Sequence, residues 1–281
     1  MFTVKRHRFA CGARHLPQLY YAASNFAKTR IMSSLTVSVI VFACVFGGSL
    51  LGVILRASLP KENLSPESRD VVKLAMGTIA TMTAVILGLL VASAKGYYDN
   101  QSRELTEMSA RIVLLDRILA HYGPEAKDAR DQLRETVVRL LNKIWVEPSS
   151  KASKAEPSAA GEVIFDKIQG LSPQNDAQRS LQARALNLAM QIGETRWLMF
   201  EQASTSISKP MLLVVIFSLA ITFTSFSLHA APNATVVVTL ILCALAVSAT
   251  LFLILEMYTP FQGIIRIPSD PLRNALAHLG Q

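Results

Sequence analysis

Residues 74–122, LAMGTIATMTAVILGLLVASAKGYYDNQSRELTEMSARIVLLDRILAHY, join an uncharged apolar stretch to a charged amphipathic one. The first part belongs to the apolar segment Val71–Ala94, which is long enough to cross a bilayer as a helix. Only Gly96 interrupts the passage into the second part, and Gly123-Pro124 follows it as a stop signal. The second part carries apolar residues at steps of three and four, a coiled-coil-like seam on one helix face: Leu105, Met108, Ile112, Leu115, Leu119 and Tyr122. We therefore predict one continuous helix that leaves the membrane and enters water.

Three further apolar segments resemble Val71–Ala94 in length and composition, and apart from Lys73 none of the four contains a charged residue. Charged residues make up 17% of the 281-residue chain, whereas soluble domains carry about 25%. We predict an all-α membrane protein with four transmembrane helices and a cytoplasmic helical bundle between spans two and three. The short connection 229–233 contains Pro232-Asn233 and predicts a tight antiparallel hairpin of spans three and four. The other spans are Leu35–Leu55, Met211–Leu228 and Ala234–Leu255.

The ends of the chain differ from its middle. Residues 1–31 hold six basic residues and no acidic one, and we expect them to form a disordered basic extension of a single membrane domain, 32–281. By the positive-inside rule this charge places the N-terminus in the cytoplasm. An even number of spans then places the segment 95–209 and the tail 256–281 there too, in a multi-pass protein of the inner membrane. Two alternatives stay open: a natural start at Met32, and an organelle transit peptide, which is also rich in arginine and free of acids.

The segment 95–209 has balanced charge, with 16 basic and 15 acidic residues, which is typical of a solvated helical surface and argues against a nucleic-acid partner. We expect three or four helices, with a loop at Pro148–Gly161. Their apolar seams pack within one subunit or, alternatively, between subunits. The later seams are Leu133, Val137, Leu140 and Ile144, then Leu181, Ala185, Leu188, Ile192 and Met199.

The sequence carries no recognisable catalytic or metal-binding motif. The five histidines are scattered, and HExxH, CxxC, GxSxG, P-loop and GxGxxG patterns are missing. We therefore assign no catalytic residue, cofactor or metal ligand, and expect the protein not to be an enzyme. The spans hold no ionisable group at mid-depth, which argues against a proton-coupled transporter, whereas a channel does not need one.

The second span carries a stripe of small and hydroxylated residues, which lets helices approach closely in lipid. The stripe packs within one subunit or, alternatively, lines an axial path in a homo-oligomer. Arg69 and Lys73 would then form a positively charged outer mouth that attracts anions, unless Lys73 only reaches the headgroups. The residues assigned to pore lining or helix packing are Gly77, Thr78, Thr81, Ala84, Val85 and Gly88, with Ala92 extending the stripe.

Three stretches resemble the bacterial bestrophin-like membrane proteins. They are LGLLVASAKGYYDNQSRELTEMSARI (87–112), LNLAMQIGETRWLMF (186–200) and LEMYTPFQGIIRIPSDPLRNAL (255–276). The resemblance implies the four-span fold. True bestrophins are pentameric anion channels whose second span lines the pore, and the resemblance implies the same arrangement as an expectation for this chain. The aromatic and acidic clusters of true bestrophins are not evident, and no catalytic set is carried over.

Two functions follow from these observations. The first is a homo-oligomeric, bestrophin-like ion channel, with anions favoured over cations. The alternative is a membrane-anchored interaction or regulatory protein whose cytoplasmic bundle binds a partner. In the tail, Glu256 is expected to pair with Arg103 or Arg111, and 264–267 to run extended against the cytoplasmic helices.

Overall fold

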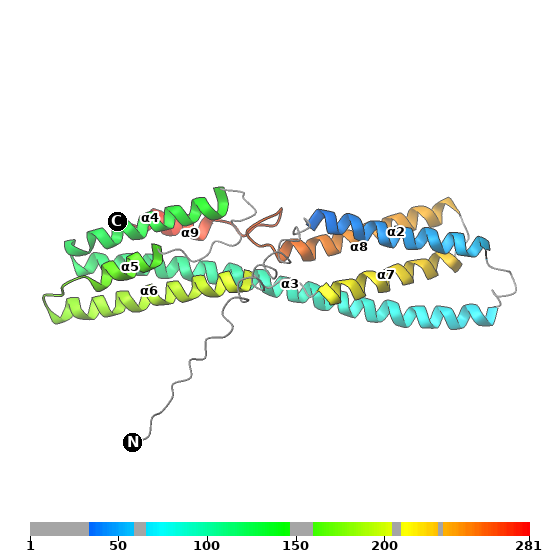
Figure 1. Cartoon of the computed structure of the whole chain (residues 1–281), viewed down its shortest axis with the longest axis horizontal. Helices are drawn as coiled ribbons and strands as arrows, with labels where there is room; N and C mark the ends of the chain where they lie inside the picture. Colours follow the sequence, from blue (N-terminus) through cyan, green and yellow to red (C-terminus); the bar gives the residue numbers. More distant parts are fainter. Residues whose placement is uncertain (1–33, 59–65, 147–159, 204–208, 230–232) are drawn as a thin grey trace, which may run out of the picture.

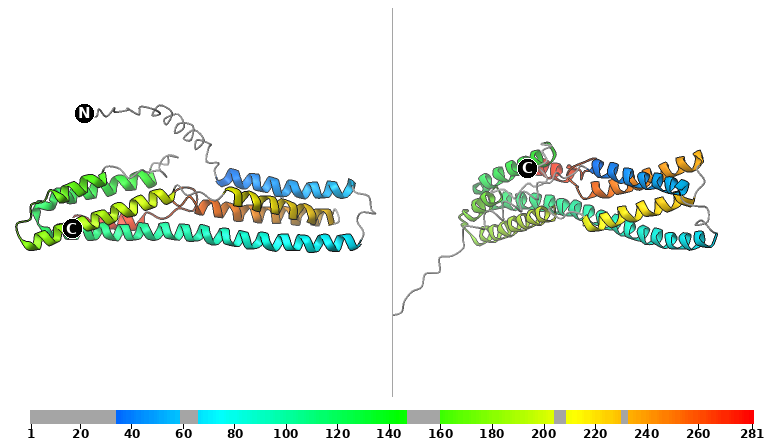
Figure 2. Two further views of the ribbon diagram at one scale, coloured as in Figure 1. Left: turned by 60° about the horizontal axis from the view of Figure 1, so that its bottom comes forward. Right: turned by 45° about the vertical axis from the view of Figure 1, so that its right-hand side comes forward.

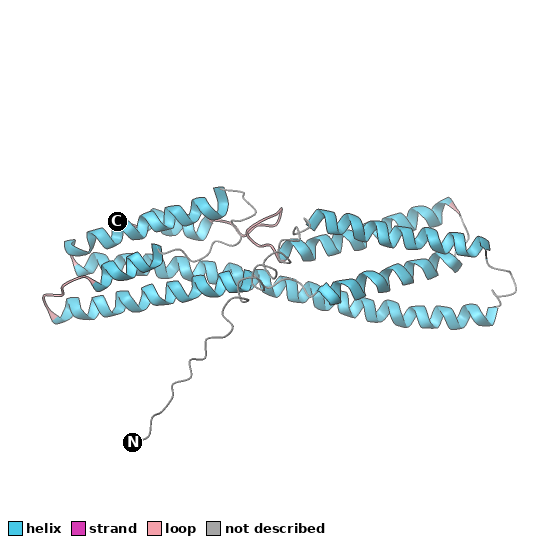
Figure 3. Cartoon of the chain, viewed as in Figure 1, coloured by secondary structure: helices cyan, strands magenta, loops and turns pink. Residues whose placement is uncertain are grey.

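A computed structural model describes residues 34–58, 66–146, 160–203, 209–229 and 233–281. All regular secondary structure in these ranges is helical (Figure 3), which confirms the all-α class. The basic extension 1–31 and almost all of the expected loop Pro148–Gly161 lie outside the described residues.

The helices form two bundles placed end to end (Figure 1). The apolar bundle contains α2 (Ser34–Ser58), the first half of α3 (Pro66–Tyr122), α7 (Lys209–His229) and α8 (Ala234–Met257). The polar bundle contains the second half of α3 with α4 (Lys127–Leu141), α5 (Ala160–Gln169), α6 (Asp176–Ala203) and α9 (Asp270–His278). Two short elements flank α4, a 3-10 turn η2 (Pro124–Ala126) and a π-helical turn η3 (Asn142–Val146). The other views show the same division (Figure 2).

Helix α3 runs through both bundles without interruption, as the sequence predicted. It has 57 residues, which at 1.5 Å per residue is about 85 Å. Gly96 stays helical, and a Cβ at this position would find open space. The helix ends at Tyr122 because Gly123 adopts φ 131°, a conformation that favours glycine, and Pro124 then begins η2.

Four described helices are long and apolar enough to span a membrane, in agreement with the four predicted spans. Helices α2 and α3 each pack on both α7 and α8, and the most extensive packing is between α2 and α7. Gly48 and Gly52 on α2 bring its backbone against that of α7, because ideal Cβ atoms there would lie within 3.0 Å of α7 atoms. Close backbone approach of this kind is how helices gain packing energy in lipid.

The predicted tight hairpin of α7 and α8 is wrong. The two helices follow each other in the chain, but they do not pack closely on each other. A 320 Å³ hollow opens between them, with Phe223 and Phe226 on one side and Leu240 on the other. The physical reason is that α7 packs on the glycine-containing face of α2, which allows a closer approach than α8 does.

The seam of α3 is the core of the polar bundle. Leu105, Leu115 and Leu119 are fully or almost fully buried, together with the other seam residues. They pack on α4, α5, α6 and α9 of the same chain, so packing within the subunit, one of the two interpretations, is correct for this seam.

The tail returns to the polar bundle, as expected, and then forms a helix that was not expected. The buried Ile267 accepts a hydrogen bond at its carbonyl from Trp145 Nε1 at 3.0 Å. Helix α9 follows and packs on α3 and α4. The turn Ser269-Asp270-Pro271 before it is an ordinary helix start, with proline in the first turn.

A buried ion pair fastens the end of the chain. Asp116 on α3 is 1% exposed and accepts hydrogen bonds from Arg130 of α4 at 2.8 and 2.9 Å. Its second oxygen also accepts from the backbone N–H of Gly280 at 3.2 Å. The hydrogen bond with Asp116 raises the pKa of Arg130. These bonds hold α3, α4 and the C-terminal turn together.

Candidate functional site

The first half of α3 is the least covered of the four candidate spans. Only 11% of its most apolar window is buried, against 33% in α2, 33% in α7 and 22% in α8. We call six exposed residues the outward stripe: Gly77, Thr78, Thr81, Ala84, Val85 and Gly88. An ideal Cβ at Gly77 or at Gly88 would have no atom within 4 Å. In the structure these residues therefore face away from their own chain.

The hydroxyl groups of the outward stripe are satisfied within their own helix. Thr78 Oγ1 donates to the carbonyl of Leu74 at 3.1 Å, and Thr81 Oγ1 donates to the carbonyl of Thr78 at 2.8 Å. Their oxygens keep lone pairs directed at the surroundings, whereas Thr83 is buried on the opposite side of the helix. The outward stripe is thus narrow, uncharged and weakly polar.

Of the two basic residues expected at the outer mouth, the structure describes the side chain of only one. Lys73 is exposed and forms an ion pair with Asp70 at 3.5 Å, one turn away on α3. The side chain of Arg69 lies outside the described residues. Since the partner carboxylate cancels much of the field of Lys73, this residue contributes less positive charge than the sequence suggested.

Below the outward stripe, the same exposed side of α3 becomes charged. Lys95 pairs with Asp99 and lies 5.7 Å from the ring centre of Tyr98. One turn further, Arg103 is exposed, and no hydrogen bond or ion pair is found for it among the described residues. The exposed side of α3 thus changes along the helix from hydroxyl groups to an exposed guanidinium.

A layer of amide side chains joins α3 to α6 at the junction of the two bundles. Gln101 is fully buried, and its Nε2 donates to Gln202 Oε1 at 2.6 Å. Gln202 Nε2 in turn donates to Glu104 Oε1 at 3.1 Å. A buried amide in an otherwise apolar seam fixes the register of helices, because any shift would leave it without partners.

Tyr258, just beyond α8, attaches the last span to this layer. Its hydroxyl lies 3.0 Å from Ser93 Oγ, and its ring stacks on that of Tyr97 with centroids 5.4 Å apart. Tyr97 donates in turn to the carbonyl of Gln202 at 3.3 Å. Three helices, α3, α6 and α8, thus meet at one polar and aromatic layer.

Glu256 does not pair with either arginine that the sequence suggested. Its carboxylate accepts the backbone N–H of Ile264 at 2.5 Å and faces that of Ile265 at 3.5 Å. Gly263 has φ 81°, and a Cβ there would collide with the carboxylate. The sharp turn after α8 brings these N–H groups to Glu256, whereas Arg111 is engaged by Thr195 at 2.8 Å.

Several of these features were not singled out in the sequence, although one left a signal. Gln101 lies four residues before Leu105, so it continues the seam of α3 with a polar residue. No group of three or more His, Cys, Asp or Glu side chains that could hold a metal ion occurs among the described residues.

Comparison with known proteins gives a consistent result. Residues 43–272 match the family model described as Bestrophin-like domain. A crystal structure described as a membrane protein superposes with a TM-score of 0.58 at 14% identity, covering 87% of this chain and 99% of that one. A mutant of a bacterial bestrophin homolog from Klebsiella pneumoniae superposes with a TM-score of 0.57 at 14% identity, covering 86% and 99%. None of the curated proteins compared with the chain matches it. At such identities the superpositions establish a shared fold.

Proposed function

Because this chain, a multi-pass membrane protein, belongs to the bestrophin-like family, we propose that it forms a homo-oligomeric ion channel whose path runs along the outward stripe of α3. One observation carries the proposal: the small residues of α3 have no partner within their own chain. In lipid, small residues are useful where another helix approaches closely. A second copy is the simplest source of that helix, and a ring of copies would enclose a path.

Anions are the favoured ions in this proposal. The outward stripe carries no acidic side chain, and hydroxyl groups can donate to an anion when their rotamers change. Further along α3, Arg103 is exposed without a described partner. The chain as a whole carries a formal net charge of +8. A positive field raises the local concentration of anions, and salt weakens the effect.

Replacing Gly88 by leucine tests the oligomer. Since no atom of the same subunit lies within 4 Å of a Cβ at Gly88, the leucine fits the isolated subunit and obstructs only a neighbour. We expect normal yield in detergent and a shift to smaller species in size-exclusion chromatography with light scattering. Ala246→Leu on α8, also an exposed small residue, is the matched control and should leave the size unchanged. If Gly88→Leu has the same size as the wild type, the outward stripe is not a contact between copies.

The same proposal places both ends of the chain and the polar bundle in the cytoplasm, on the basis of the basic residues before α2. A single cysteine at Ser180, an exposed position on α6, tests this in a background without Cys11, Cys44 and Cys243. We expect a membrane-impermeant maleimide to label it only after the cells are permeabilised. Labelling in intact cells would show that the polar bundle lies outside the cell and would contradict the proposed orientation.

Conduction itself is tested with purified protein in planar bilayers. We expect chloride currents that scale with protein amount and decline when gluconate replaces chloride. If no current appears in any salt or at any voltage, the alternative of a membrane-anchored interaction protein becomes the better account.

A further inference from the structure

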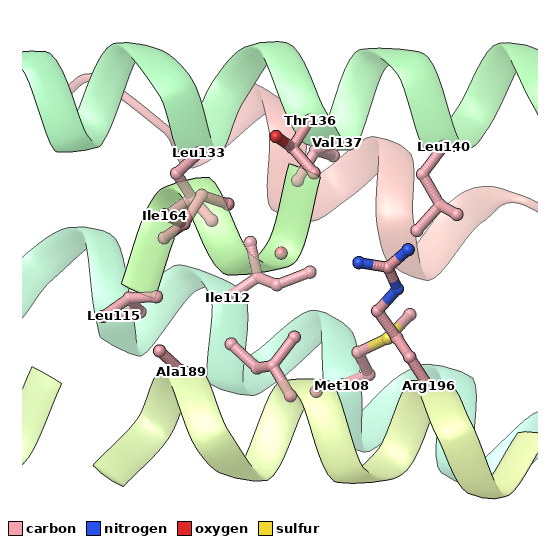
Figure 4. Close-up of a pocket in the computed structure, with 13 residues that line it drawn as sticks. Met108, Ile112, Leu115, Leu133, Thr136, Val137, Leu140, Ile164, Ala189 and Arg196 are labelled. Atoms are coloured by element: carbon pink, nitrogen blue, oxygen red, sulfur yellow. The ribbon is translucent and has the colours of Figure 1, made fainter. Parts of the chain in front are cut away.

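The polar bundle contains a small cavity between α3, α4, α5 and α6 (Figure 4), with a volume of about 80 Å³. Its walls are almost entirely apolar, with Met108 and Ile112 from α3 and Leu140 from α4 among them. Two glycines line it: a Cβ at Gly193 would find open space, and a Cβ at Gly161 would lie 3.2 Å from Arg196 Nη1. The cavity is separate from the outward stripe, which belongs to the other bundle.

One charged side chain enters this apolar space. Arg196 extends from α6 across the cavity toward Leu140 (Figure 4). It is partly buried, and no carboxylate or other acceptor is found for it among the described residues. Burial lowers the pKa of Arg196, yet a guanidinium remains protonated at neutral pH. The guanidinium is partly screened from water and has no acceptor among the described residues, so an anion that reached it would gain charge-assisted hydrogen bonds.

A second polar group in the wall also lacks a partner. Thr136 on α4 has a buried hydroxyl without a hydrogen bond in the structure. Buried hydroxyl groups are normally satisfied, and each exception calls for an explanation. An acceptor bound in this cavity would satisfy both the hydroxyl and the guanidinium.

We propose that this cavity binds a short-chain carboxylate of about four carbons. A carboxylate matches the fork of Arg196 with two parallel hydrogen bonds, and an aliphatic tail fits the apolar walls. A cavity of about 150 Å³ accommodates the six carbons of benzene. This one is about 80 Å³, so it has room for an aliphatic tail of about three carbons while the carboxylate stays at the guanidinium. Phosphate fits less well, since one arginine balances only part of its charge and the walls offer few other donors.

Butyrate is the probe, tested on the full-length protein in detergent by isothermal titration calorimetry and thermal unfolding, with sodium chloride at equal ionic strength as reference. We expect saturable binding of one butyrate per subunit and an unfolding midpoint raised by several degrees. Arg196→Gln should weaken binding at least tenfold. Arg184→Gln, an exposed arginine on the same helix, should leave it unchanged.

A second variant leaves the arginine in place and fills the space. A Cβ at Gly193 would have open space around it, so Gly193→Leu should enter the cavity, keep or raise the unfolding midpoint, and abolish butyrate binding. The proposal is overturned if the wild type shows no saturable binding, or if binding survives in both Arg196→Gln and Gly193→Leu. It is also overturned if butanol binds as tightly as butyrate, because the site would then be an apolar void without a carboxylate role.

Discussion

Replacing Gly52 by alanine is expected to abolish most of the folded protein, whereas the same change at Gly47 is expected to be silent. A Cβ at Gly52 would overlap the carbonyl oxygen of Thr224 and approach Ser227 Cβ to 2.8 Å and Leu228 N to 3.1 Å. Two of these three atoms are backbone atoms of α7, which cannot turn aside. Overpacking of a core costs about 1–3 kcal/mol and occasionally more, and a backbone collision belongs at the upper end, about 3 kcal/mol.

Gly47 is a matched control on the same helix, since no atom lies within 4 Å of its ideal Cβ. Alanine there gains helix propensity and should be neutral or slightly stabilising. Gly48→Ala should fall between the two, with contacts of 2.9 Å to Ala220 O and to Thr224 Oγ1, a side chain that can rotate. The three variants are ranked by the yield of monodisperse protein and by the thermal unfolding midpoint, both measured in the same detergent. Equal behaviour of Gly52→Ala and Gly47→Ala would contradict the close packing of α2 on α7.

Replacing Thr81 by tryptophan is expected to reduce bilayer currents at least tenfold at equal protein amount. Thr81 is exposed within its subunit, so the indole has room during folding and would fill only the proposed path between copies. Ala246→Trp on α8 adds the same bulk at another exposed site and should conduct like the wild type. Oligomer size is measured in parallel: a loss of current together with smaller species would report a broken contact between copies, as for Gly88→Leu, and only a loss at normal size places Thr81 in the path. Full current in Thr81→Trp, with normal size, would place the path elsewhere.

The parts of the fold that could be predicted from the sequence were those with a strong periodic pattern. The seam from Leu105 to Tyr122 marks one face of a helix unambiguously, and Gly123-Pro124 ends that helix where the pattern ends. The four spans were equally clear, because a membrane helix must satisfy its own backbone and therefore needs a long apolar stretch.

The arrangement of the spans could not be predicted in the same way. A span that is apolar on every side does not show which face meets a neighbour, so the short link between α7 and α8 wrongly suggested a tight pair. The missed signal was Gly48-Ser49-Leu50-Leu51-Gly52, two glycines four residues apart on α2. This spacing is typical of close helix contacts in membranes.

The candidate sites were predicted only in part, because each depends on neighbours distant in sequence. The outward stripe was found as a composition, but its exposure follows from where α7 and α8 pack. Arg196 resembles any charged residue on a helix surface until α3, α4 and α5 surround it. Glu256 was given a side-chain partner because the turn that presents the N–H of Ile264 leaves no sequence pattern.

Because α3 is uninterrupted, it connects the two bundles mechanically. A helix of 57 residues has arms of about 43 Å on either side of its midpoint, and the junction layer of Gln101, Gln202 and Tyr258 lies near that midpoint and serves as the fulcrum. A tilt of about 5° would displace each end by about 4 Å in opposite directions. If α3 tilts as one rigid rod, a displacement of its end in the polar bundle is accompanied by an opposite displacement of the outward stripe.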